Sequence, residues 1–333
     1  MICSEITDLA QLLESFACPP SGYSQTPFWW WVGEPLSLER LIWQLDQLRE
    51  GGVTSAIISY NHGADGAPNL GEPRVFSEPW WALLRAVLDH ASATGMTLGM
   101  QDYSLLKPMF EQIGIAHNMG GQALRFADVT NDNKGALPSD SHVLEYGSDF
   151  LSSGEPRMVA TITVHTAFNP VPAESGSRVI EAFYEPYRQN LGAHFGSTFA
   201  IFFQDELDFT DRFPFWSADL PKIFLEQKGY SFIGRLHDLH SRDPSTAQFR
   251  IDFADVQTMV VEQHYFRPVF EWMERHKCLF GHDNAGRGSP GVGRSYYGDY
   301  MRTMRWYSAP GSDDPDLRGP RAFKGLKVGP PRE

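Results

Sequence analysis

The chain has 333 residues, of which 42% are hydrophobic and 21% are charged, a composition that excludes disordered, collagenous and coiled-coil proteins. Its 41 acidic and 28 basic residues leave a net charge of −13, and without a basic run we expect no nucleic-acid partner. Because no apolar run approaches the ~18 residues of a membrane helix, we expect no membrane contact. The surplus of acid favours solubility, with a cation site as the alternative.

The number and spacing of the cysteines, together with the N-terminal segment, indicate the cellular compartment of the protein. Cys3, Cys18 and Cys278 are widely spaced and match neither a metal-site pattern nor a disulfide framework, which fits a reducing environment. Residues 1–16 lack a basic start followed by a long apolar stretch, so they do not resemble a signal peptide. We therefore expect a cytoplasmic protein.

The first hundred residues predict alternating strands and helices joined by short links. Residues 1–26 are expected to form a short helical lead-in followed by a segment rich in Pro, Gly and Ser. Apolar residues within 37–50 recur on one helical face, and Ser37 is placed to cap that helix. The remaining predictions in this part are strands over 27–33, 53–60 and 96–104 and a helix over 77–95.

The alternation then breaks and later resumes. Residues 122–175 contain short β-prone runs separated by Asn, Asp, Gly, Pro and Ser, and they predict a small antiparallel β insertion. After it we expect a helix at 178–192 disturbed by Pro186, a strong strand at 197–209, mostly helical structure over 219–276, a strand at 277–284 and a helix at 298–307.

Repeated βα units predict an α/β fold of the (β/α)8 TIM-barrel type. The barrel is expected over 27–316, with an irregular tail at 317–333. The chain offers about six barrel strands, near 28–32, 54–60, 96–102, 198–206, 277–283 and 307–312, so we predict an incomplete barrel.

In such a barrel, side chains at the carboxyl ends of the strands face the active site. The candidates at the strand ends are carboxylates, amides, imidazoles and indoles, and among them we find no serine-nucleophile, phosphate-loop or HExxH motif. They are Trp29, Trp30, Trp31, Asn61, His62, Gln101, Asp102, Tyr103, Gln204, Asp205, Glu206, His282, Asp283 and Asn284.

The sharpest of these features is the Asp205–Glu206 pair that ends the most apolar strand. Neighbouring strand residues point to opposite sides, so only one of the two faces the centre while the strand is regular. Burial raises the pKa of a carboxyl group, and a general acid for a glycosidic oxygen needs a raised pKa. The structural alternative is a carboxylate that caps the next helix or pairs with an arginine.

Six segments, in their order and spacing, resemble the catalytic barrel of glycoside hydrolase family 106, the α-L-rhamnosidase-like enzymes. They lie within residues 25–316 and are PFWWWVGEPLSLERLIWQLDQLREGGV, WWALLRAVLDHASATGMTLGMQDY, FAIFFQDELDF, PKIFLEQKGY, LFGHDNAGRG and GDYMRTMRWYSAPGSDDPD. The resemblance implies an (α/β)8 barrel that hydrolyses a terminal deoxy-sugar from a carbohydrate substrate with inversion.

The resemblance also implies roles for the strand-end residues. Glu206 would be the general acid and Asp205 its support or a ligand, while some family members hold a calcium ion, so Ca²⁺ is the one cofactor it suggests. Trp29 or Trp31 would stack on the sugar ring. The expected substrate-binding residues are completed by Asn61, His62, Gln101, Asp102, His282, Asp283 and Asn284.

Two other interpretations stay open, and the first of them follows from a departure from this pattern. In the relatives, a second catalytic carboxylate and further barrel units follow the Pro-Gly-x-Asp region, whereas here the chain reads FKGLKVGPPRE. The first alternative is therefore a truncated, inactive relative or a carbohydrate-binding fragment. The second is another barrel glycosidase, such as a β-galactosidase-like enzyme, which shares the acid on the fourth strand.

Overall fold

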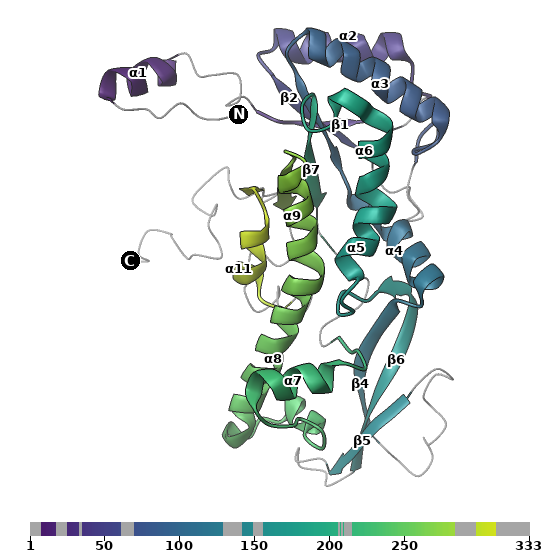
Figure 1. The fold of residues 1–333 in the computed structure, drawn as a ribbon, viewed down its shortest axis with the longest axis vertical. Coiled ribbons are helices and arrows are strands. Elements are labelled where there is room, and N and C mark those ends of the chain that lie inside the picture. Colours follow the sequence, from purple (N-terminus) through teal and green to yellow (C-terminus); the bar gives the residue numbers. More distant parts are fainter. Residues whose placement is uncertain are drawn as a thin grey trace, which may run out of the picture. The chain divides into compact units, whose positions relative to one another are not determined.

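The computed structural model describes residues 8–17, 25–32, 35–60, 70–128, 142–148, 156–205, 207, 209, 215–283 and 298–310 (Figure 1). The chain divides into two compact units. Unit 1 comprises Met1–Leu105, Glu185–Asp205 and Met273–Gly281. Unit 2 comprises Leu106–Tyr184, Glu206–Trp272 and His282–Glu333.

Six strands form the larger sheet in the order β1-β2-β3-β7-β8-β9, and the first four pair in parallel. Their bounds are β1 Phe28–Trp30, β2 Ser55–Ser59, β3 Thr97–Gln101, β7 Phe199–Asp205, β8 Leu279–Asp283 and β9 Ala309–Pro310. Each strand lies within one of the six strand ranges expected from the sequence. The described strands thus give an α/β fold with a mainly parallel sheet, and its closure into a barrel stays a prediction.

This sheet is strongly curved within unit 1. The rings of Phe28 on β1 and Phe203 on β7 have centroids 5.2 Å apart, although β2 and β3 lie between the two strands. In a flat sheet, strands three spacings apart lie about 14 Å from each other, and side chains that stand roughly perpendicular to the sheet keep that separation. The sheet therefore bends toward the face that carries these two rings, which we call the concave face.

Helices cover the opposite face of the strands in unit 1. In α2 (Leu38–Glu50) the hydroxyl oxygen of Ser37 accepts a hydrogen bond from the backbone N–H of Arg40, which is the predicted N-cap. In α3 (Glu78–Ala93) the rings of Trp80 and Trp81 are buried and contact Tyr187 on α6 (Glu185–Leu191). The short α1 (Leu9–Ala17) and the turn η3 (Gly192–His194) also belong to unit 1.

Two long helical stretches each contain a wider π-helical turn just before a proline. One runs α5 (Ser175–Val179), η2 (Ile180–Tyr184) and α6, in which Pro186 is the second residue. The other runs α8 (Ala247–Val261), η6 (Glu262–Phe266) and α9 (Arg267–Arg275), in which Pro268 is the second residue. Proline has no N–H and its ring collides with the carbonyl four residues earlier, so a wider turn relieves that collision. The irregularity predicted at Pro186 is thus a π turn that precedes it.

Unit 2 contains a three-stranded antiparallel sheet in the order β4-β6-β5. Its strands are β4 Gly120–Asp128, β5 His142–Ser148 and β6 Pro156–Phe168, in the region where the sequence predicts antiparallel strands. The unit's core includes the stacked rings of Phe110 and Phe168, with Tyr265 beside them. None of the described helices is long and apolar enough to cross a membrane.

The other helical elements of unit 2 are mostly short. They are α7 Leu220–Lys228, η4 Leu236–His240, η5 Pro244–Thr246, α11 Tyr300–Thr303 and η7 Met304–Trp306. The longer helix α4 (Tyr103–His117) belongs to unit 2 from Leu106 onward, and the sequence does not predict it because Pro108 lies inside it and proline disfavours helix interiors. Tyr103, considered above as a strand end, is the first residue of this helix.

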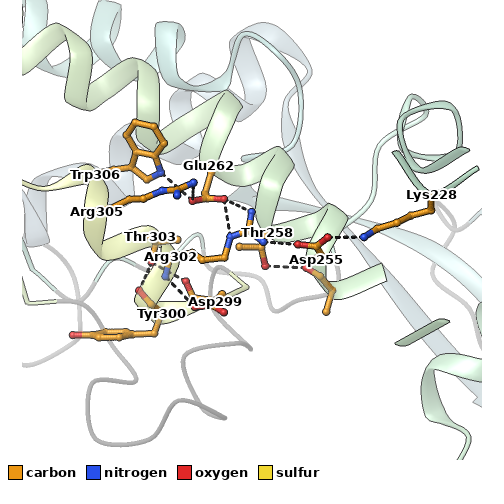
Figure 2. A network of polar contacts seen from close by, with 11 residues as sticks. Lys228, Asp255, Thr258, Glu262, Asp299, Tyr300, Arg302, Thr303, Arg305 and Trp306 are labelled. Atoms are coloured by element: carbon orange, nitrogen blue, oxygen red, sulfur yellow. Dashed lines mark hydrogen bonds and ion pairs between the residues drawn. The ribbon is translucent and has the colours of Figure 1, made fainter. Parts of the chain in front are cut away.

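A buried carboxylate fixes the segment 298–310 to the helix that runs from α8 to α9 (Figure 2). The Glu262 side chain is only 2% exposed and accepts hydrogen bonds from Arg302 Nε at 3.0 Å and Trp306 Nε1 at 3.1 Å. A guanidinium nitrogen of Arg305 lies 2.8 Å from the same carboxylate. Arg302 also donates to Asp255, which accepts a hydrogen bond from Lys228. Because a buried charge is costly unless paired, this network stabilises the segment's position.

We expect Glu262→Gln to lower the free energy of unfolding by about 2–3 kcal/mol, because two guanidinium groups lose their shared counter-charge at a buried site. The measurement is equilibrium denaturation in urea. Glu271→Gln is the matched control, since Glu271 pairs with Arg267 at the surface and should cost less than about 1 kcal/mol. Equal effects of the two substitutions would contradict this account.

Candidate active site

Asp205 ends β7 and is held by a glutamine from the neighbouring strand. The Nε2 of Gln101 donates a hydrogen bond to Oδ2 of Asp205 over 2.5 Å. Gln101 lies opposite Phe203 in the β3–β7 register, and Asp205 follows two residues later on the same side as Phe203. Asp205 therefore belongs to the concave face, at the carboxyl end of its strand.

A glycine permits this pairing of β3 with β7. A Cβ added to Gly99 would lie 2.4 Å from the backbone oxygen of Ile201, which is too close for any side chain. The register shifts at this point, between Leu98 and Gly99. The close approach brings Gln101 and Asp205 into contact farther along the two strands.

Gln101 itself has an unused polar atom. Its side chain is buried, and within the described residues its Oε1 has no hydrogen-bond partner. A buried carbonyl oxygen without a partner is costly, whereas a sugar hydroxyl would donate to it. The expected substrate-binding role of Gln101 is compatible with this geometry.

Asp102 holds the backbone of Asp205 through a hydrogen bond. Its side chain is fully buried, and its carboxylate lies 3.3 Å from the backbone nitrogen of Asp205 and 3.3 Å from Nε2 of Gln204, both of which donate to it. Burial raises the pKa of the Tyr187 hydroxyl well above its ordinary value, and the nearby charge of Asp102 adds to this effect. The Asp102 carboxylate thus already binds groups of the protein, and it is placed to orient Asp205.

The three consecutive tryptophans divide between the two faces of the sheet. Trp29 and Trp31 are 7% and 1% exposed, they pack edge to face, and Trp29 Nε1 donates to Gln44 Oε1 of α2. Both rings therefore lie in the layer between the sheet and α2, where no ring face is open to a sugar.

Trp30, a strand-end candidate that was given no substrate-binding role above, has the opposite environment. It is 48% exposed and contacts Phe28 edge to face, at a centroid distance of 6.0 Å. Because Phe28 also contacts Phe203, Trp30 belongs to the concave face with Asp205. Strand alternation separates Trp30 from its two neighbours, but which face is concave depends on contacts between distant strands.

His282 and Asp283 end β8 and belong to unit 2. Both side chains are buried, and the His282 ring lies 4.5 Å from the ring of Tyr307. Burial lowers the pKa of His282 to about 4, so its imidazole is neutral at pH 7. Within the described residues its Nδ1 has no hydrogen-bond partner, which leaves a polar atom able to bind a hydroxyl group.

The remaining predicted residues, Asn61, His62, Glu206 and Asn284, lie outside the described residues. Their expected roles stay predictions. In the part of the chain that the structure describes, no three His, Cys, Asp or Glu side chains come together to hold a metal ion.

Comparison with known proteins relates the fold to a carbohydrate-active enzyme. No model of a known protein family matches the chain, and no curated protein matches it significantly. Among solved structures, the chain is similar to a rhamnosidase from Novosphingobium sp. PP1Y, with a TM-score of 0.58 at 9% identity over 89% of this chain and 49% of that one. The chain therefore shares a fold with that rhamnosidase and spans about half its length.

Two further structures align less well. An isomaltulose synthase from Klebsiella sp. LX3 has a TM-score of 0.34 at 10% identity, over 79% of this chain and 44% of that one. An exo-β-N-acetylglucosaminidase from Vibrio harveyi has a TM-score of 0.34 at 10% identity, over 78% and 35% of the respective chains. These alignments are too weak to support an argument.

The buried imidazole of His282 predicts a pH-dependent stability. Its pKa is about 4 in the folded chain and about 6.5 in the unfolded chain, so only the unfolded state binds this proton between those values. The free energy of unfolding should therefore fall as the pH drops from 6.5 to 4, by about 3 kcal/mol in total.

His282→Asn should remove this part of the pH dependence, as measured by urea denaturation at pH 4 to 7. His117→Asn, at an exposed position on α4, is the matched control and should leave the dependence unchanged. An identical slope in the wild type and in both variants would show that His282 titrates normally.

Proposed function

We propose that the chain is the catalytic barrel of a glycoside hydrolase related to the family 106 α-L-rhamnosidases, which removes a terminal sugar with inversion. One observation carries the proposal: Asp205 is fixed by Gln101 at the carboxyl end of β7, on a concave face that also bears aromatic rings. Carboxylates at this end of the strands are where barrel enzymes place their chemistry. The fold shared with a rhamnosidase supports the proposal.

In the proposed reaction Glu206 is the general acid. It would protonate the glycosidic oxygen as the bond between that oxygen and the anomeric carbon breaks, while a water molecule attacks the opposite face of the sugar. Asp205 would accept a hydrogen bond from a sugar hydroxyl, and its negative charge would stabilise the developing oxocarbenium ion. Gln101 and Asp102 would hold Asp205 in place, because both interact with it directly.

Inversion also requires a second carboxylate about 6.5–9.5 Å from the acid, which takes the proton of the attacking water. Asp102, the described carboxylate next to Asp205, already accepts hydrogen bonds from Gln204 and from the Asp205 backbone. It is therefore a poor candidate for this base, and we assign it the positioning role.

We expect Glu206→Gln to lower kcat/KM for an aryl α-L-rhamnoside by about 10²–10⁴-fold, because the amide has no proton to give. Asp205→Asn should lower it by about 10²-fold or more, since the charge at the reacting centre is lost. The matched control is Asp89→Asn, at an exposed position of α3, which should not change the rate. The released sugar, followed by proton NMR, should first appear as the inverted anomer.

Other outcomes would select another interpretation. Equal rates for the wild type and Glu206→Gln would contradict the assignment of the acid. Release of the retained anomer would contradict the inverting mechanism, and a preference for an aryl β-galactoside would favour a β-galactosidase-like enzyme. Sugar binding measured by calorimetry without turnover would identify a carbohydrate-binding relative.

A further inference from the structure

A pocket of about 230 Å³ lies in unit 1 beside the end of β1. Its described walls come from Trp30, from Val32, Pro35 and Leu36 between β1 and α2, and from the first turns of α2. Leu36 and Leu41 supply apolar walls, while Ser37, Arg40 and Gln44 supply polar ones. The pocket is smaller than the ~300–1,000 Å³ of a typical drug-sized site, so a single ring fits it better than a larger ligand.

The chemistry of these walls suits a sugar. The half-exposed indole of Trp30 offers a flat apolar surface, onto which the apolar face of a pyranose ring can stack. Oε1 of Gln44 already accepts a hydrogen bond from Trp29 Nε1, which orients the amide and leaves its NH₂ group as a donor. An aromatic platform beside a fixed amide donor matches the alternating apolar and hydroxyl surfaces of a sugar ring.

A row of aromatic rings connects this pocket with the concave face. Trp30 contacts Phe28, and Phe28 contacts Phe203, which lies two residues before Asp205 on β7. All of these residues belong to unit 1. A chain of sugars could therefore lie along the rings, with one unit at Asp205 and another in the pocket.

We propose that this pocket is a second sugar-binding subsite, which holds a pyranose ring other than the one that is cleaved and makes the protein selective for oligosaccharides. The proposal rests on the function proposed above. It assigns to Trp30 and Gln44 the recognition of substrate length, and it leaves the chemistry to the carboxylates at the end of β7.

The test measures binding, so that it does not depend on turnover. Isothermal titration calorimetry compares L-rhamnose with an α-L-rhamnosyl trisaccharide, using the chain of 333 residues with the substitution Glu206→Gln to prevent hydrolysis. The trisaccharide should bind at least about tenfold more tightly than the monosaccharide, and Trp30→Ala should abolish that difference. Trp43→Ala is the matched control, because Trp43 is also exposed and on α2 but does not line the pocket.

A second pair of variants tests the same proposal in case Trp30→Ala does not fold. Gln44→Glu keeps an acceptor for Trp29 Nε1 but loses the amide donor, so it should also reduce the preference for the trisaccharide. Gln47→Glu, at an exposed position of the same helix, should not reduce it. Thermal melting curves should be the same for all four variants.

Two results would overturn the proposed subsite. One is a preference for the trisaccharide that survives both Trp30→Ala and Gln44→Glu, and the other is equal binding of both sugars by the parent chain. Failure of the proposed function gives a different result. A chain that hydrolyses no glycoside can still bind the trisaccharide more tightly than the monosaccharide in this assay. Conversely, an active enzyme without the preference would retain the proposed function and lose only the subsite.

Discussion

Alternation of side chains along a curved parallel sheet is the constraint on which the proposed site depends. Phe28 and Phe203 meet across two intervening strands, and this contact defines the concave face. Given that face, alternation places Trp30 and Asp205 on it and turns Trp29 and Trp31 toward α2. A shift of one residue in β1 would remove the indole of Trp30 from the concave face, and a shift of one residue in β7 would remove the carboxylate of Asp205 from it.

The position of Asp205 is supported from two sides. Gln101 binds its carboxylate from the neighbouring strand, and Asp102 accepts a hydrogen bond from its backbone nitrogen. Gly99 allows the two strands to approach closely enough for both contacts. A group held in this way loses little freedom when a substrate binds, which is the usual advantage of a preorganised site. Gln101, the last residue of β3, and Asp102, which follows it, thus both hold the side chain or backbone of Asp205.

Much of the local structure follows from sequence, whereas the contacts between distant residues do not. The apolar runs locate the strands, and Ser37 marks the start of α2, because strand propensity and helix capping act over a few residues. The orientation of Trp29–Trp31 depends on which face of the sheet curves inward. Because the three residues are identical, the sequence does not indicate that Trp30 is the one on the concave face. The sequence did not indicate α4, because Pro108 lies inside it and proline is unfavourable in a helix interior. The hydrogen bond from Arg302 to Glu262 joins residues 40 apart, which share no local sequence pattern.

The most direct test of this account is a crystal structure of the Glu206→Gln chain with a bound α-L-rhamnosyl oligosaccharide. The account predicts one sugar ring stacked on the indole of Trp30 and a neighbouring ring with a hydroxyl group hydrogen-bonded to Asp205. A sugar bound on the helix-facing side, against Trp29 or α3, would contradict the assignment of the concave face as the substrate site. A structure in which Trp30 and Asp205 lie on opposite faces of the sheet would contradict it equally.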